Sequence, residues 1–178
     1  IQETLYRRMT IVDVINVGGG LGVDYQSPDK QPIPDFAAYF AVFHKHLTLR
    51  PTQHLFFELG RAVVCQCGSL ITRTLYVKEG VQKKFVIVDA GMTDLIRPAL
   101  YQAYHSIENI SSHLPSQQYD VVGPICESSD CFGKVVTLPE TSRGDLIAIR
   151  SAGAYGEIMA SQYNCRCLPG VYYSDDLK

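Results

Sequence analysis

The chain has 178 residues, a formal net charge of −2, 46% hydrophobic residues and 19% charged residues. This composition is typical of a folded protein with a core and excludes a disordered chain, which combines low hydrophobicity with high net charge. The near-neutral charge argues against a protein that binds nucleic acid by neutralising phosphates. The longest apolar run, residues 36–43, is too short to span a bilayer.

The N-terminal third of the chain reads as alternating strand and helix. A β-branched apolar run over residues 11–17 predicts a buried strand that stops at the glycine loop, residues 18–22. Aromatic and apolar residues at helical spacing predict a helix over 36–47 that Asp35 caps. A second short apolar strand is predicted over 54–57. Strand, helix and strand in this order predict parallel pairing of the two strands.

A predicted β-hairpin follows. A stretch rich in Val, Ile, Thr, Leu and Tyr over residues 62–77, a turn at Gly80 and a strand over 85–88 carry this prediction. One helix comes next, with Thr93 or Asp94 as its cap. The apolar side of that helix comprises Leu95, Ile96, Leu100, Tyr101 and Tyr104.

Short strands and turns fill the rest of the chain. Strands are predicted over residues 119–122, 145–149 and 161–166. The predicted fold class is therefore α/β over residues 1–60 and mostly antiparallel β over residues 61–178.

The chain contains six cysteines: Cys65, Cys67, Cys126, Cys131, Cys165 and Cys167. Disulfide frameworks belong to short secreted chains that cannot build a core. Structural zinc prefers Cys-x2-4-Cys knuckles, whereas two of the pairs here are Cys-x-Cys. We therefore expect reduced thiols in a cytosolic protein, histidines that are solvated or structural, and no metal site.

The glycine loop is the first candidate site. Glycines after a buried strand let backbone N–H groups approach a phosphate closely. The loop lacks the third glycine of a Rossmann fingerprint, because Val23 stands there, and no Gly-Lys-Ser/Thr follows as in a Walker loop. The sequence of the loop fits both a phosphate site and a simple tight turn.

Residues 58–61, Glu-Leu-Gly-Arg, form the second candidate. Here a carboxylate and a guanidinium flank a glycine at the end of an apolar strand, where parallel barrels place their functional residues. The alternative is a salt-bridged strand end without a further role.

Three further segments combine reactive or polar side chains with turns. Residues 123–130 place the thiol of Cys126 beside acidic residues in a turn-rich stretch, which fits a reactive thiol or a capped turn. Tyr155 lies between glycines, as in many plain turns. Arg97 and Tyr101 are four residues apart, so both would point from one helix face.

Taken in order, five segments resemble the fold-type III pyridoxal-phosphate decarboxylases over residues 11–165. They are Asn16-Val17-Gly18-Gly19-Gly20-Leu21-Gly22, Glu58-Leu59-Gly60-Arg61, Asp89-Ala90-Gly91-Met92, Cys126-Glu127-Ser128-Ser129-Asp130 and Gly153-Ala154-Tyr155-Gly156. The third and fourth segments favour the branch that acts on diaminopimelate over ornithine and arginine decarboxylases. The resemblance implies an alanine-racemase-like (β/α)8 barrel followed by a C-terminal β-barrel or sandwich domain. Residues 1–60 would be the last barrel units, and residues 61–178 the β-domain.

The resemblance also implies pyridoxal 5'-phosphate as cofactor. The cofactor-binding residues would be Gly18, Gly19, Gly20, Glu58, Leu59, Gly60, Arg61 and Tyr155. The three glycines would cradle the phosphate, and Glu58 would keep the pyridine nitrogen protonated. Arg61 would bind phosphate or a substrate carboxylate as a planar fork.

The substrate implied is meso-2,6-diaminopimelate, converted to L-lysine and CO2 in the last step of lysine biosynthesis. Arg97, Tyr101 and Tyr155 would hold its distal end. Family members are homodimers with shared active sites, so Cys126 would enter the partner's site as proton donor. Glu127 would there contact a substrate ammonium group.

Two departures from the family pattern qualify the resemblance. Leu59 stands where the family usually has proline, which removes no functional group. No lysine of the chain has the sequence context of the lysine that forms a Schiff base with the cofactor. We therefore expect the chain, which begins at Ile1, to be an inactive C-terminal part of a longer enzyme. A half-barrel exposes strand edges, so it should associate or be poorly ordered.

Two other functions remain open: a sibling decarboxylase acting on ornithine or arginine, and a non-catalytic β-domain that binds a partner protein.

Overall fold

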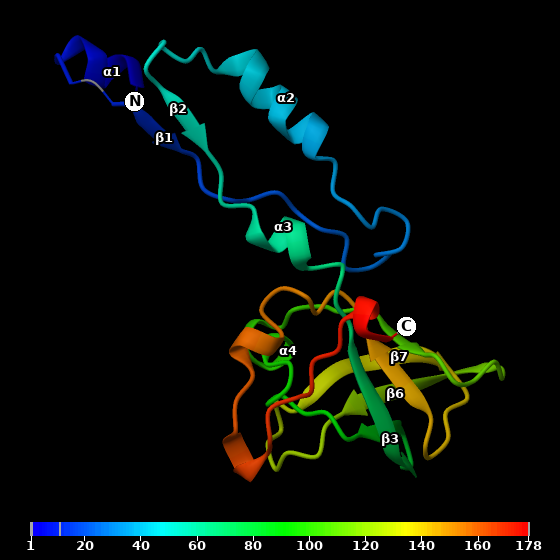
Figure 1. Cartoon of the computed structure of the whole chain (residues 1–178). Coiled ribbons are helices and arrows are strands. Elements are labelled where there is room, and N and C mark those ends of the chain that lie inside the picture. Colours follow the sequence, from blue (N-terminus) through cyan, green and yellow to red (C-terminus); the bar gives the residue numbers. More distant parts are fainter. Residues whose placement is uncertain (1, 11, 178) are drawn as a thin grey trace.

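The computed structural model describes residues 2–10 and 12–177, and it divides into an elongated N-terminal segment and a curved sheet region (Figure 1). The N-terminal segment, residues 2–58, comprises α1 (Gln2–Arg7), β1 (Val14–Asn16), α2 (Phe36–His46) and β2 (His54–Phe56). Helix α3 (Gly60–Val64) connects this segment to the sheet region, residues 65–177 (Figure 1). No helix in the described part of the chain is long and apolar enough to cross a membrane.

The predicted parallel pairing in the N-terminal segment is confirmed. β1 and β2 pair in parallel with Val14 opposite His54 and Asn16 opposite Phe56. Both strands are shorter than predicted, and Ile11 lies outside the described residues. The capping prediction is also confirmed, because the Asp35 side chain accepts a hydrogen bond of 2.8 Å from the N–H of Ala38.

The prediction of one extended stretch over residues 62–77 is wrong at its start. The chain forms α3 first, with backbone bonds from Val63 to Leu59 and from Cys65 to Arg61, and its strand begins only at Leu70. The β-branched residues at 63 and 64 suggested a strand, but one helical turn costs them little when both stay exposed.

The sheet has six strands in the order β5-β8-β3-β4-β6-β7. They are β3 (Leu70–Glu79), β4 (Lys84–Val88), β5 (Ile107–Asn109), β6 (Ser116–Val122), β7 (Cys131–Pro139) and β8 (Leu146–Ile149). All pairs are antiparallel except β4 with β6, and the hairpin of β3 and β4 confirms that prediction. The end strands β5 and β7 contact each other, so the sheet is nearly closed.

The helix predicted after residue 93 is shorter than expected. α4 (Arg97–Tyr101) begins after Ile96, and neither Thr93 nor Asp94 caps it. The Asp94 carboxylate instead accepts a hydrogen bond of 2.7 Å from the N–H of Gly91, which closes a turn before the helix.

The strand predicted over residues 161–166 is also wrong. Tyr163–Cys165 is a 3-10 helix, as are Glu157–Met159 and Ser174–Leu177. Asn164 and Cys165 have φ values of 57° and 56°, which an extended strand does not allow.

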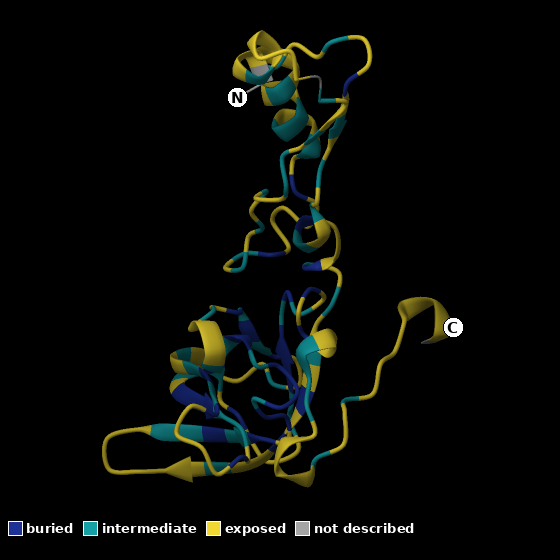
Figure 2. Ribbon diagram, turned by 90° about the vertical axis from the view of Figure 1, so that its left-hand side faces the viewer, coloured by how far each residue is buried: buried dark blue, intermediate teal, exposed yellow. Residues whose placement is uncertain are grey.

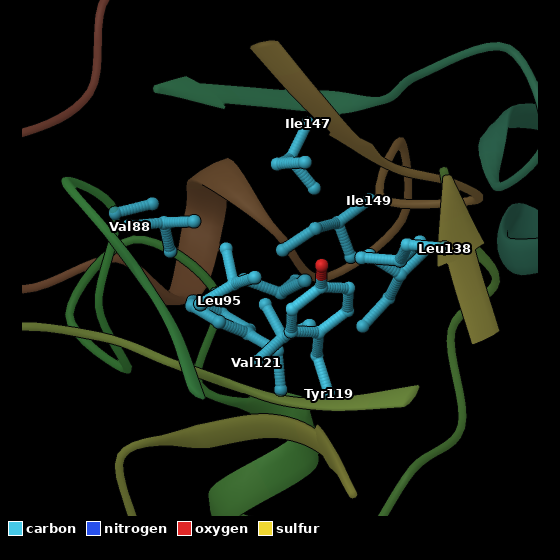
Figure 3. Packing of buried hydrophobic residues seen from close by; sticks show 11 residues of the cluster. Val88, Leu95, Tyr119, Val121, Leu138, Ile147 and Ile149 are labelled. Carbon is cyan, nitrogen blue, oxygen red and sulfur yellow. The ribbon is translucent and has the colours of Figure 1, made fainter. Parts of the chain in front are cut away.

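The hydrophobic core lies inside the curved sheet. Its fully buried members include Val88, Leu95, Val121, Ile147 and Ile149, which converge from β4, β6, β8 and the turn before α4 (Figure 3). Buried residues gather in the sheet region, whereas the N-terminal segment is mostly exposed or intermediate (Figure 2). The described C-terminal residues run away from the sheet in the same view.

Candidate functional site

The carboxyl ends of β1 and β2 bring the first two candidate segments together. Because the strands are parallel, the glycine loop and Glu58 leave the same edge of the small sheet. The N–H of Glu58 donates to the carbonyl of Gly18 at 2.8 Å. Asn16 orients both partners, since its amide donates to Glu58 Oε1 at 2.7 Å and its Oδ1 accepts from the Gly18 N–H at 2.8 Å.

The glycines of the loop are required by geometry at three positions. Gly18 and Gly20 have φ values of +71° and +109°, which side chains disfavour. A Cβ at Gly19 would lie 2.6 Å from the carbonyl oxygen of Glu58. Within residues 2–10 and 12–177, the backbone N–H groups of Gly19 and Gly20 donate no hydrogen bond. The loop therefore offers two free amides beside an exposed carboxylate.

Arg61 lies in α3, three residues after Glu58. It is half-buried, and its guanidinium forms no ion pair with any part of the chain that the structure describes. Glu58 has Asn16 as its hydrogen-bond partner instead. The structure therefore does not contain the alternative, which is a salt bridge between Glu58 and Arg61 at the strand end. The Arg61 guanidinium is available to bind a ligand.

Tyr155 belongs to a turn that packs on α3. The N–H of Gly153 donates to the carbonyl of Cys65 at 3.0 Å, and a Cβ at Gly153 would lie 2.0 Å from the carbonyl of Val64. Tyr155 itself has a φ of 61° and is 48% exposed. Strained backbone of this kind is concentrated at functional sites. The turn thus places an exposed tyrosine two residues after Gly153, which packs on the end of the helix that carries Arg61.

Arg97 and Tyr101, predicted to share a helix face, lie in different environments. Tyr101 is 61% exposed, whereas Arg97 is 7% exposed. The Arg97 guanidinium donates to the Tyr25 hydroxyl at 3.1 Å and to Nε2 of His105 at 3.0 Å. Because Tyr25 follows the glycine loop closely in sequence, this contact joins the N-terminal segment to the sheet region.

The loop that carries Cys126 and Glu127 is organised by a buried carboxylate. Asp130 accepts hydrogen bonds from the N–H groups of Ile125 at 2.7 Å and Met92 at 2.6 Å. Burial raises the pKa of Asp130, although both backbone N–H groups act in the opposite direction. Cys126 and Glu127 are exposed, so this carboxylate presents them at the surface.

Among the described residues, no hydrogen bond or ion pair joins the loop of Cys126 and Glu127 to the glycine loop, Arg61 or Arg97. Glu127 accepts a hydrogen bond of 2.6 Å from the hydroxyl of Tyr163, and this contact raises the pKa of that tyrosine. Tyr163 lies beyond the five segments singled out in the sequence.

Some residues that shape the site were not foreseen. Asn16 belongs to the first segment and received no role, and Tyr39 donates to the carbonyl of Gly19 at 3.3 Å from α2. Tyr25 carried no signal beyond its position after the glycine loop. His105, expected to be structural or solvated, is 2% exposed and contacts Arg97.

The six cysteines are free thiols, and only Cys65 is buried. No group of three or more His, Cys, Asp or Glu side chains with metal-binding geometry occurs in the described ranges.

Comparison with known proteins relates this chain to one protein family. Residues 9–153 match the family model described as the C-terminal sheet domain of pyridoxal-dependent decarboxylases. A diaminopimelate decarboxylase of Bacteroides thetaiotaomicron is 66% identical over 177 residues, which is 99% of this chain and 46% of that protein.

Solved structures agree. A diaminopimelate decarboxylase from M. jannaschi superposes with a TM-score of 0.82 at 34% identity over 94% of this chain and 39% of that one. The Helicobacter pylori enzyme complexed with L-lysine gives a TM-score of 0.74 at 42% identity over 91% and 39%. The chain thus spans less than half the length of these relatives. By sequence and by fold, it belongs to the pyridoxal-dependent decarboxylases and contains their C-terminal sheet domain.

Proposed function

We propose that the complete protein carrying this chain is a diaminopimelate decarboxylase, which converts meso-diaminopimelate to L-lysine and CO2 in the cytoplasm. The observation that carries this proposal is the pair of free Gly19 and Gly20 amides beside Glu58 and the unpaired Arg61. The names of the relatives support the choice of substrate.

The residues at this edge fit pyridoxal phosphate. Free backbone amides in a glycine loop suit a phosphate. Pyridoxal phosphate supplies an electron sink for the pair left when a carboxylate departs as CO2. Glu58, fixed by Asn16, would accept a hydrogen bond from the protonated ring nitrogen, with Leu59 and Gly60 as the neighbouring backbone. Arg61 would bind phosphate or a substrate carboxylate as a fork.

The substrate end is proposed to lie between α4 and the turn of Tyr155. Arg97 would pair with a distal carboxylate, and the exposed rings of Tyr101 and Tyr155 would exclude water around it. Tyr155 would also approach the phosphate, because its turn packs against α3.

We further propose that the active enzyme is a homodimer in which each chain completes the other's site. Cys126 and Glu127 are exposed, and no hydrogen bond or ion pair among the described residues links them to the other site residues of their own chain. Cys126 would donate a proton to the substrate carbon in the partner's site, and Glu127 would exchange Tyr163 for a substrate ammonium group.

The two-part architecture supports the domain assignment. Residues 1–60 would be the last units of a (β/α)8 barrel, since β1, α2 and β2 form a parallel βαβ unit. Residues 61–178 would be the β-domain. The lysine that forms a Schiff base with the cofactor would lie outside this chain, and the chain by itself would not turn over substrate.

The test uses the complete gene product with pyridoxal phosphate. We expect CO2 and L-lysine from meso-diaminopimelate, and slower release of CO2 from ornithine or arginine. Gly19→Ala, which forces a Cβ against the Glu58 carbonyl, should weaken cofactor affinity by about tenfold or more.

The matched control is Gly22→Ala, where a Cβ meets nothing within 4 Å and φ is unstrained. It should keep the affinity within about twofold. Faster turnover of ornithine or arginine would instead identify a sibling enzyme. No turnover, with equal cofactor affinity in both variants, would favour the non-catalytic module.

A further inference from the structure

The guanidinium of Arg97 is held by Tyr25 and His105, which have no role in the proposed function. One of its terminal nitrogens, Nη1, carries two N–H groups, and both have partners. The first points to the Tyr25 hydroxyl at 3.1 Å, and the second points to Nε2 of His105 at 3.0 Å. The guanidinium is therefore fixed from one side by a loop of the N-terminal segment and by the chain leading into β5.

The bonding of His105 defines its protonation. Its Nδ1 lies 2.8 Å from the carbonyl oxygen of Arg150, which can only accept a hydrogen bond. Nδ1 therefore carries the proton, and Nε2 is left as the acceptor that Arg97 requires. Burial and the adjacent guanidinium lower the pKa of His105, although the Arg150 carbonyl acts in the opposite direction.

Tyr25 supports Arg97 with both its hydroxyl and its ring. The hydroxyl lies between Arg97 Nη1 and the Cys65 thiol, 3.3 Å from the sulfur. The guanidinium carbon lies 5.2 Å from the ring centroid, and the ring meets that of His105 edge-on at 5.3 Å. The pKa of Tyr25 is raised, chiefly by burial. The hydroxyl therefore stays protonated, and its oxygen can accept the hydrogen bond from Arg97.

The other edge of the guanidinium has no such partners. Among the described residues, Nε and Nη2 of Arg97 form no hydrogen bond or ion pair, and these two nitrogens form the side that binds a carboxylate in a bidentate manner. We propose that Tyr25 and His105 are positioning residues that present this edge of Arg97 to a carboxylate of the substrate. The inference rests on the proposed function and adds how the substrate-binding arginine is oriented.

Tyr25 lies close in sequence to the glycine loop. Tyr25 follows Gly22 by three residues, so one short loop connects the proposed phosphate cradle to the arginine. A change that loosens Tyr25 should therefore weaken substrate binding while leaving the cradle glycines untouched.

Paired variants of the complete gene product test the role of His105. In His105→Asn the side-chain amide can replace Nδ1 toward Arg150, but the acceptor for Arg97 is lost. In His105→Gln the side-chain oxygen can replace Nε2. We expect KM for diaminopimelate to rise about tenfold in the Asn variant, with kcat within about threefold, and to recover largely in the Gln variant.

Tyr25→Phe removes only the hydroxyl and should also raise KM about tenfold. Tyr104→Phe is the matched control, since Tyr104 is 57% exposed and outside the site, and its KM should not change. In the wild type KM should stay level down to pH 6.5 and rise only below it, whereas the Asn variant should lack this rise.

The possible failures are distinguishable. A wild-type protein that does not decarboxylate diaminopimelate overturns the proposed function. An active wild type whose KM is unchanged in Tyr25→Phe and His105→Asn overturns the positioning roles. Independently of activity, 15N shifts of His105 should report the neutral Nδ1–H tautomer, and the Nε2–H tautomer would contradict the inference.

Discussion

The sheet region and the N-terminal segment are held together by different interactions. In the sheet region, fully buried side chains such as Val86, Val121 and Ile147 meet inside a nearly closed sheet. In the described part of the N-terminal segment, the only buried residues are Pro28, Pro34 and Gln53. Helix α2 has no buried residue at all. What holds the glycine loop in shape is a set of hydrogen bonds, not a core.

This difference explains how the candidate site is built. The cradle and Glu58 come from the segment without a core, whereas Arg97, Tyr101 and Tyr155 come from or adjoin the cored sheet. The two parts are joined by a few polar contacts besides Tyr25. Arg150 pairs with Asp29 at 2.5 Å, and the Gln66 amide donates to the carbonyls of Pro28 and Gln31.

The largest contrast should appear when buried side chains are shortened. Ile147→Ala opens a cavity in the core and should reduce the free energy of unfolding by about 3–4 kcal/mol. Phe40→Ala in α2 removes a half-buried ring whose nearest ring partner is Phe57 and should cost about 1 kcal/mol. Urea denaturation followed by circular dichroism measures both. Equal losses would contradict the contrast.

A smaller effect is expected at the loop of Cys126. Asp130→Ala leaves the N–H groups of Ile125 and Met92 without their acceptor, which should cost about 2 kcal/mol. Ser128→Ala in the same loop is the control, because Ser128 is exposed and should change stability by less than about 0.5 kcal/mol. If Asp130→Ala were neutral, the loop would not depend on this carboxylate.

The smallest expected effect is the pH dependence of stability that His105 of the sheet region contributes. The pKa of His105 is lowered in the folded protein, so its contribution to stability is complete above pH 6.5 and is lost as the pH falls toward the lowered value. His44 is exposed in α2, and its replacement by asparagine is the matched control for the same substitution at His105. Thermal unfolding of wild type, His105→Asn and His44→Asn between pH 5 and 8 measures this. A His44→Asn variant that abolished the pH dependence would contradict the assignment.

Local sequence signals predicted much of the fold. The cap at Asp35, the parallel strands and the hairpin of β3 and β4 follow from capping, order and periodicity within short windows. Strand β7 was missed because its burial does not alternate, as its pairing with β6 shifts register twice. Strand β5 has only three residues, which is too short for a periodic signal.

The candidate site, like the fold, could be predicted from the sequence only in part. The five segments could be recognised because each is continuous in sequence, and the structure brings the first two into contact. The bond of Tyr25 to Arg97 joins residues 72 positions apart, and no local pattern predicts it. The roles assigned to Cys126 and Glu127 depend on a second copy of the chain and stay predictions.

Residue-by-residue hydrogen exchange of the 178-residue chain tests the central contrast most directly. Amides of β3, β4, β6 and β8 should exchange slowest, since they open only when the core unfolds. Amides of β1, β2 and the glycine loop should exchange orders of magnitude faster. Equal protection in β1 and β4 would show that the N-terminal segment unfolds together with the core, and would contradict the account.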